Sequence, residues 1–328
     1  MTLKNKIELI MCVTIVCGLI FSPLSLPCAH ADYPAKPIHI VAPYAPGGGT
    51  DILARTIAAI MGKEKIITSP IIVENRPGGG GAVGMDYVGA KKGNPYYLLT
   101  VVTTFISNPI LKLTKVSYKD FTIICQLAFD PNIITVRTDY KYNTMEKLIE
   151  AAKKNPGKIR YGGTGATGSD RIVSLMLEKE TGAKFNFIPF QSGGEVTTAL
   201  LGKHVDVIAN QMNESYSQIM AGKFKALAIT SEERSKYMPD MPTVKESGAN
   251  VIFGTMRGIA APADISEEAR KFLEDAFTKL DASERWQKEY IQKFQLQRQF
   301  RNGAEFRKRI IETTERYKEI YKTLGLLK

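Results

Sequence analysis

Predominantly apolar runs alternate with amphipathic stretches along most of the chain. Residues 38–42, 96–102 and 121–127 form such runs, which is the pattern of strands buried in a sheet. Between the runs, apolar residues recur every three or four positions, as they do in 145–152, and this spacing predicts helices with one buried face. Strands that alternate with helices predict an α/β fold with mainly parallel sheets.

The alternation occurs in two successive blocks. Each block begins with a strand, a glycine-rich loop and a helix, and the two loops are residues 43–51 and 162–168. This repetition predicts two similar α/β lobes. Because no low-complexity linker separates the blocks, we expect short crossing strands near 133–137 and 226–230 to join them.

The expected crossing points divide the chain into lobes. Lobe 1 is predicted to comprise residues 32–133 together with 229–328, and lobe 2 to comprise residues 134–228. The tail of lobe 1, residues 266–328, is expected to be helical because apolar residues recur there at helical spacing.

Residues 1–31 are predicted to be a cleavable secretory signal peptide. Lys4 and Lys6 give a positive start, residues 9–21 are apolar, and Ala29 and Ala31 are the small residues expected before a cleavage site. A membrane anchor is the alternative, but a span takes ~20 apolar residues and this run is shorter. We therefore expect an exported protein.

Composition and charge exclude some classes of function. The chain has 328 residues, enough for two domains, and Lys and Arg outnumber Asp and Glu by 44 to 33. This balance favours anionic partners, but the basic residues are dispersed and form no nucleic-acid module. Of the four cysteines only Cys125 lies beyond the signal peptide, so neither an internal disulfide nor a thiolate metal site is expected.

The two glycine-rich loops carry the candidate chemistry. Residues 47–51 and 165–169 each leave a predicted strand and enter a predicted helix. The first backbone N–H groups of a helix have no partner inside it, and the helix dipole adds positive potential there, so this arrangement binds anions. The alternative is a tight turn that needs glycine only to fold. Two such loops in successive blocks favour a ligand gripped from both sides.

Further candidates follow the carboxyl ends of other predicted strands, where ligands of open α/β sheets bind. Arg171, close behind the second loop, is either a charge partner for a carboxylate or a surface arginine. Asp51 either caps its helix or contacts the ligand. The remaining candidates are Thr103, Thr104, Gln191 and Asn210.

A nicotinamide site is not expected. Gly163, Gly165 and Gly168 match the dinucleotide pattern, but that site needs an acidic residue at the end of the next strand. No carboxylate follows that strand until Glu195, and the chain contains no P-loop motif.

Enzymatic and metal chemistry are not expected either. His39 and His204, the histidines beyond the signal peptide, belong to no catalytic or metal-binding motif. We therefore expect no cofactor and no metal. An exported α/β enzyme acting on an acidic substrate remains the alternative function, although the sequence offers no nucleophile with an adjacent base.

The chain resembles a known receptor family. Its landmarks are residues 43–51, 73–79, 161–165, 221–228 and 238–244, which read PYAPGGGTD, VENRPGG, YGGTG, AGKFKALA and MPDMPTV. With these segments the chain is similar to the Bug-type extracytoplasmic solute receptors of the tripartite tricarboxylate transporter family. The resemblance covers essentially all of the chain after the signal peptide.

The resemblance implies a periplasmic binding protein of the type II kind, whose two lobes close on a small organic anion. It implies a carboxylate ligand that is delivered to permease subunits in the membrane. We also expect the protein to be a monomer. A co-receptor that presents its ligand to a sensor is a further alternative. Carried over by position, the segments implied in binding are residues 46–51 of the first loop and residues 163–169 of the second. The individual residues expected to bind the ligand are Tyr44, Pro46, Gly47, Gly48, Thr50 and Asp51 from the first loop, and Thr164, Gly165, Ala166, Thr167, Gly168 and Ser169 from the second.

Overall fold

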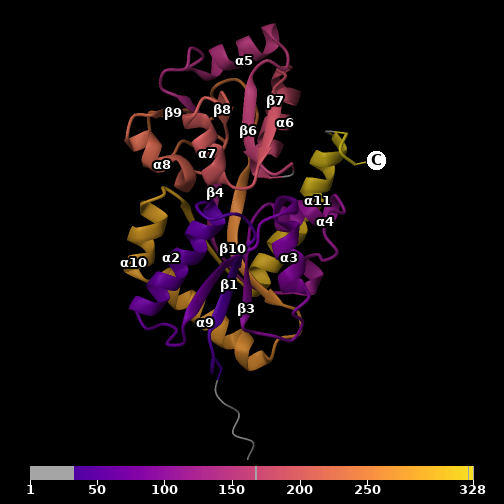
Figure 1. Ribbon diagram of the computed structural model, residues 1–328, viewed down its shortest axis with the longest axis vertical. Helices are drawn as coiled ribbons and strands as arrows, with labels where there is room; N and C mark the ends of the chain where they lie inside the picture. The colour runs from indigo at the N-terminus through magenta and orange to yellow at the C-terminus, as the bar shows by residue number, and fades with distance from the viewer. Residues whose placement is uncertain (1–32, 167, 324, 328) are drawn as a thin grey trace, which may run out of the picture. The chain divides into compact units, whose positions relative to one another are not determined.

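The computed structural model describes residues 33–166, 168–323 and 325–327, which belong to one compact unit. The predicted signal peptide and Thr167 lie outside the described residues. The described chain forms two β-sheets with helices packed around them, which confirms the predicted α/β class (Figure 1). None of the described helices combines the length and the apolar character that a membrane span requires.

A six-stranded sheet contains the strand that precedes the first glycine-rich loop. β1 pairs in parallel with β2 and β3, whereas β10 pairs antiparallel with β3 and β4, and β11 pairs antiparallel with β4. In spatial order its strands are β11 (Gln297–Asn302), β4 (Phe121–Pro131), β10 (Gly254–Pro262), β3 (Tyr97–Val101), β1 (Ile38–Ala42) and β2 (Ile71–Asn75).

A five-stranded sheet contains the strand that precedes the second loop. β6 pairs in parallel with β7 and β8, and β5 pairs antiparallel with β8 and β9. In spatial order its strands are β7 (Asn186–Phe190), β6 (Arg160–Thr164), β8 (Val207–Ile208), β5 (Ile133–Arg137) and β9 (Phe224–Ile229).

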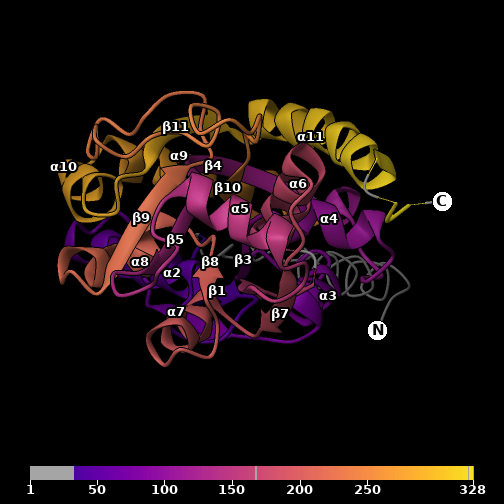
Figure 2. The same ribbon diagram turned by 90° about the horizontal axis from the view of Figure 1, so that it is seen from above.

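Each sheet has its own set of helices (Figures 1 and 2). Around the six-stranded sheet lie α2 (Gly49–Lys63), α3 (Ala82–Gly89), α4 (Thr104–Ile110), α9 (Glu267–Ala282), α10 (Glu284–Trp286) and α11 (Gly303–Thr323). Around the five-stranded sheet lie α5 (Met145–Lys154), α6 (Ser169–Thr181), α7 (Gly193–Leu201) and α8 (Met212–Met220).

The sequence prediction was wrong on strand direction and on the tail. The sheets are mixed, not mainly parallel, because β4 and β10 run antiparallel to each other where the chain passes between the sheets. The tail is not entirely helical, since β11 adds an edge strand to β4. The segment of β11, QRQFRN, is polar because an edge strand is half exposed, and this polarity hid it among the charged helical faces.

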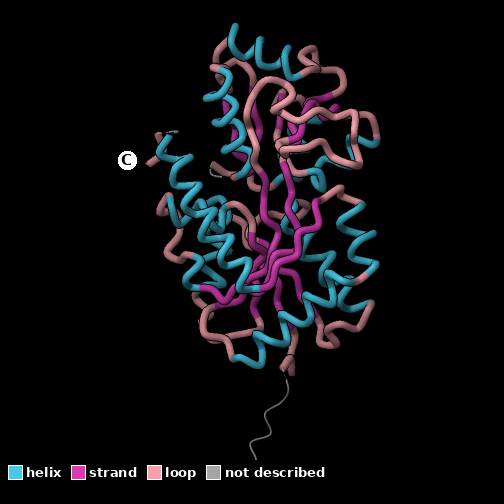
Figure 3. Tube along the Cα trace, turned by 180° about the vertical axis from the view of Figure 1, so that it is seen from behind, coloured by secondary structure: helices cyan, strands magenta, loops and turns pink. Residues whose placement is uncertain are grey.

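The chain crosses between the sheets along two neighbouring segments. β4 ends at Pro131 and β5 begins at Ile133, so that Asn132 alone separates strands of different sheets. The second crossing leaves β9 through Thr230, whose backbone N–H donates to the Asn132 carbonyl at 2.9 Å. Figure 3 shows strands running between the two parts of the molecule here. The predicted lobe boundaries remain a proposal, although the five-stranded sheet draws all its strands from residues 133–229.

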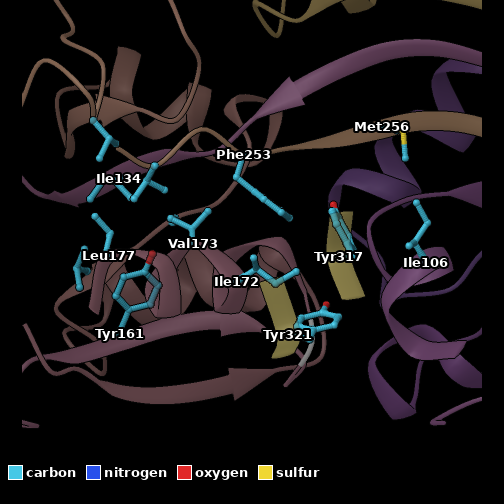
Figure 4. Close-up of a cluster of buried hydrophobic side chains, with 14 of the residues drawn as sticks. Ile106, Ile134, Tyr161, Ile172, Val173, Leu177, Phe253, Met256, Tyr317 and Tyr321 are labelled. Carbon is cyan, nitrogen blue, oxygen red and sulfur yellow. The ribbon is translucent and has the colours of Figure 1, made fainter. Parts of the chain in front are cut away.

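The larger hydrophobic cluster extends from one sheet to the other. Tyr161 and Leu177 belong to the five-stranded part, whereas Ile106 belongs to the six-stranded part. Phe253 and Tyr317 lie between them, with ring centroids 5.4 Å apart (Figure 4). Apolar packing therefore continues past the crossing segments.

Two adjacent leucines of α7 allow a matched test of a smaller cluster beside the five-stranded sheet, which contains Leu200, Val205 and Ile208. Leu200 is fully buried and Leu201 is 39% exposed. We expect Leu200→Ala to lower the free energy of unfolding by about 2–5 kcal/mol, since it leaves a cavity. Leu201→Ala makes the same chemical change at the surface and should cost less than about 1 kcal/mol. Urea denaturation followed by circular dichroism measures both, and equal losses would contradict the placement of this helix face.

Candidate functional site

A small cavity lies between the two sheets where both glycine-rich loops end. It offers only about 40 Å³ of space to the centres of water-sized molecules. A buried water needs roughly 10–15 Å³ of such space, so the cavity in this form accommodates a few waters at most. Its walls are Tyr44, Gly48, Gly49, Thr50, Val102, Thr103, Thr104, Thr164, Gly168, Ser169, Asp170, Gly193, Gln211, Glu214, Thr255 and Arg257.

The first loop brings the N-terminus of α2 to the cavity. Gly47 has a positive φ of 82°, and its N–H donates to the Asp51 carboxylate at 3.0 Å. Asp51 also accepts hydrogen bonds from Arg55 and Asn75. Burial alone would raise the pKa of Asp51, but these hydrogen bonds outweigh it and lower the pKa. Asp51 therefore stabilises the conformation of the loop through its hydrogen bond with Gly47, and it does not line the cavity.

Thr50 faces the cavity from the first turn of α2. The residue is 3% exposed, and its Oγ1 has no hydrogen-bond partner among the described residues. A buried polar atom without a partner carries a free-energy penalty. A ligand that bonds to Thr50 Oγ1 would remove this penalty.

The second loop is shorter than predicted. Gly162 and Gly163 continue β6, so that the loop proper begins at Gly165. A Cβ on Gly168 would lie 2.3 Å from the Thr164 carbonyl oxygen, so the tight entry into α6 requires glycine.

Asp170 lies in the first turn of α6 and lines the cavity. Its carboxylate accepts a hydrogen bond from the Thr164 backbone N–H. Burial raises the pKa of Asp170 to about 7, although this hydrogen bond acts in the opposite direction. The charge of the cavity wall therefore changes near neutral pH.

Loops from opposite sheets touch across the cavity. A Cβ on Gly48, in the loop after β1, would lie 3.3 Å from Cβ of Ser192, in the loop after β7. A Cβ on Gly194 would lie 3.0 Å from the Gly47 carbonyl oxygen, and one on Gly165 would lie 3.1 Å from Gly80 Cα. Glycine at these positions allows a close approach of two backbones.

Arg257 contributes a guanidinium to the cavity from β10. It is 2% exposed and donates through Nε (3.0 Å) and Nη2 (2.6 Å) to Asp130 of β4. Burial alone would lower the pKa of Arg257, but the charge of Asp130 outweighs it and raises the pKa. A Cβ on Gly49 would lie 2.6 Å from Nη2, so the guanidinium also lies beside the start of α2.

Glu214 contributes a carboxylate from α8. Its Oε1 accepts a hydrogen bond of 2.7 Å from the Gly49 backbone N–H, which belongs to the other side of the cavity. Burial raises the pKa of Glu214, although Arg257 and the Gly49 N–H both act against this shift.

A chain of polar side chains forms the floor of the cavity. Gln211 Nε2 donates to Ser169 Oγ at 2.7 Å and to Thr255 Oγ1 at 3.2 Å. Thr255 Oγ1 in turn lies 2.9 Å from Thr103 Oγ1. Tyr44 closes one side, with its hydroxyl donating to the Gly80 carbonyl. These contacts connect the start of α6 to strands of the six-stranded sheet.

The structure brings many of the predicted residues together in this cavity. Gly47 and Asp51 shape the first loop without lining it, and Pro46 lines a shallow pocket nearby. Gly165, Ala166 and Gln191 line a neighbouring pocket that shares Tyr44 with the cavity. The predicted residues that line the cavity itself are Tyr44, Gly48, Thr50, Thr103, Thr104, Thr164, Gly168 and Ser169.

Arg171 and Asn210 do not line the cavity. The Arg171 guanidinium lies over the Phe187 ring, 4.7 Å from its centroid, and donates to Ser174 Oγ within α6. Asn210 is buried and donates to Oγ1 of Thr197 in α7 at 3.1 Å, so its side chain holds α7 against the segment that follows β8. The guanidinium in the cavity is that of Arg257.

Four polar residues that line the cavity were not predicted from the sequence: Asp170, Glu214, Thr255 and Arg257. Arg257 had a readable signal, because it is a lone charge in the otherwise uncharged segment of β10. Asp130 is likewise the lone charge of β4. Buried charges are nearly always paired, so two such strands predict a pair. Glu214 had no comparable signal, since an acidic residue near a helix start is ordinary.

The chain matches a family described as "Tripartite tricarboxylate transporter family receptor" over residues 53–326. A UPF0065 protein from Cupriavidus necator is 32% identical over 304 residues, which cover 92% of this chain and 91% of that protein. This similarity extends over nearly the whole length of both chains.

Solved structures share the fold. The periplasmic binding protein BugD is 28% identical, with a TM-score of 0.84 over 90% of this chain and 99% of that one. MatC from Rhodopseudomonas palustris is 22% identical, with a TM-score of 0.80 over 88% and 99%.

These similarities confirm the predicted Bug-type resemblance and the two-lobed binding-protein fold. They also confirm the prediction that the protein is a solute receptor and not an enzyme. A periplasmic location follows from the family as well. The chain belongs to the receptors of the tripartite tricarboxylate transporter family.

Proposed function

We propose that this protein captures a small organic carboxylate in the cavity and delivers it to the permease subunits of a tripartite tricarboxylate-type transporter. The observation that carries the proposal is the convergence of two helix N-termini, those of α2 and α6, on one cavity with the unpartnered Thr50 Oγ1. Helix N-termini favour negative charge. Export through the signal peptide and action as a monomer belong to the same proposal.

A structural relative supports the choice of ligand class. MatC from Rhodopseudomonas palustris has been solved with bound malate, a small dicarboxylate. Its likeness to this chain supports a carboxylate panel as the first set of compounds to test.

Ligand entry requires the cavity to open. The space present is too small for an organic acid, and loops from the two sheets touch across it. The two crossing segments at Asn132 and Thr230 are the positions where a hinge would act. Binding would then favour the closed form, as expected of a hinged receptor.

Gly48→Val tests the closing contact. The added methyl groups would meet Ser192 from the opposite loop, so they obstruct the closed form while each half keeps its own packing. Overpacking typically costs about 1–3 kcal/mol, so the affinity for any carboxylate that binds should fall about fivefold to over a hundredfold. Calorimetric titration measures the affinity, after a thermal-unfolding screen of malate and other carboxylates. A ligand at a hundred times its dissociation constant adds ~2.7 kcal/mol of stability.

Gly62→Val is the matched control. Gly62 lies near the end of α2, and a Cβ there would meet nothing within 4 Å. This variant should bind with unchanged affinity. If Gly48→Val also binds with unchanged affinity, the two loops do not close on the ligand.

Binding should strengthen as the pH falls. Asp170, with its pKa of about 7, loses its negative charge on acidification and then no longer repels a ligand carboxylate. If the complex retains the proton, affinity for an acid that stays ionised should rise about tenfold between pH 8 and pH 6. Two other carboxyl groups lie at or beside the cavity, and both act in the same direction. Burial raises the pKa of Glu214, and it raises the pKa of Asp130 to about 7 although Arg257 acts against this shift.

The variant Asp170→Asn isolates this contribution. It keeps an oxygen that accepts from Thr164 but cannot titrate, so the pH dependence should weaken, and the part that remains belongs to Glu214 and Asp130. Calorimetric titrations of both proteins across this pH range provide the comparison. An affinity that rises with pH would contradict the assignment of an anionic ligand.

A further inference from the structure

Glu214 spans the cavity from one side to the other. Its backbone belongs to α8, which packs beside the five-stranded sheet. Its Oε1 accepts a hydrogen bond from the backbone N–H of Gly49, the first residue of α2. The carboxylate therefore joins the two sides of the cavity.

The position that Glu214 occupies has the properties of a carboxylate subsite. The first N–H groups of α2 have no acceptor inside the helix, and the helix dipole places positive potential there. The Arg257 guanidinium lies beside Gly49, and the same cavity is lined by Thr50, whose buried Oγ1 has no hydrogen-bond partner among the described residues. These groups would receive the carboxylate of a ligand equally well.

A second helix N-terminus borders the same carboxylate. A Cβ on Gly193, the first residue of α7, would lie 2.2 Å from Glu214 Cδ and 2.3 Å from each of its oxygens. Glycine at this position leaves room for the carboxylate against the backbone. Glu214 is thus held between the starts of two helices from opposite sides of the cavity.

We propose that Glu214 is an internal competitor of the ligand. In the empty closed protein its carboxylate fills the subsite at the start of α2, and the ligand carboxylate displaces it on binding. Binding then exchanges one carboxylate for another at Gly49. The proposal rests on the proposed function and adds that Glu214 sets the affinity for anions without contributing an attractive contact to the bound ligand.

The alternative role for Glu214 makes the opposite prediction. If the carboxylate accepted a hydrogen bond from an ammonium or hydroxyl group of the ligand, its removal would weaken binding. If it acts as a competitor, its removal strengthens binding, because one negative charge leaves the subsite.

Glu214→Gln separates the two roles. The amide keeps the size of the side chain and an acceptor for the Gly49 N–H, but it carries no charge. With malate, or the acid from the carboxylate panel that binds most tightly, we expect the dissociation constant to fall about tenfold. Weaker or unchanged binding would overturn the proposal. Glu195→Gln removes an equal charge from an exposed position on α7 and should leave the affinity unchanged.

Glu214→Ala gives a readout that needs no ligand. It removes the contact between α8 and the start of α2, so small-angle X-ray scattering of the unliganded variant should give a larger radius of gyration than that of the parent protein. An identical radius would contradict the cross-cavity role. If the radius increases but no carboxylate binds to any variant, the proposed function fails while the cross-cavity contact stands.

Discussion

The N–H groups at the start of a helix must find acceptors, and the cavity is built around this requirement. Both glycine-rich loops deliver a helix start to the cavity, and α7 delivers a third. At the start of α2 the protein satisfies the Gly49 N–H with its own carboxylate, that of Glu214, and at the second loop the Asp170 carboxylate accepts from the Thr164 N–H at the end of β6. Their burial is tolerated because backbone N–H groups and the dipoles of the helices favour negative charge. Burial still raises the pKa of both carboxylates, and for Glu214 the charge of Arg257 opposes this shift more than the Gly49 N–H does.

Arg257, the arginine that lines the cavity, has a mainly structural role. Arg257 is paired with Asp130 across neighbouring strands, so it brings little net charge to the cavity as long as Asp130 is ionised; burial raises the pKa of Asp130 to about 7. Removing either partner would leave a buried charge uncompensated, which is far costlier than never burying the pair. The pair therefore fixes β4 and β10 at the level where they pass beneath the loops, and it holds a donor group beside Gly49.

Sequence patterns predicted the parts of the fold that depend on local repetition. The apolar runs located β1 and β5 at their observed limits, and the glycine-rich loops identified the two segments that meet at the cavity. The patterns did not predict strands that form only because a partner strand from a distant part of the chain lies beside them. β10 is rich in small residues and β11 is polar, so both are strands only because β4 lies beside them.

The residues of the candidate site likewise fall into a group that local sequence predicts and a group that depends on long-range packing. Thr50, Ser169 and the glycines of the loops were predictable, because their function depends on their place at the start of a helix. Glu214 and Thr255 were not, because they reach the cavity from elements whose positions depend on the packing of the whole molecule. Arg171 was misplaced for a related reason, since its nearness in sequence to a loop does not determine where its guanidinium points.

The two crossing segments have a mechanical consequence. Asn132 and Thr230 lie side by side and are bonded to each other through the Thr230 N–H and the Asn132 N–H. Two hydrogen-bonded segments behave as a narrow ribbon, which flexes readily across its thin dimension and resists shear in its plane. A hinge at this ribbon would therefore favour a rocking motion of the two halves over a shearing one, and the opposed loops would return to the same register each time they meet.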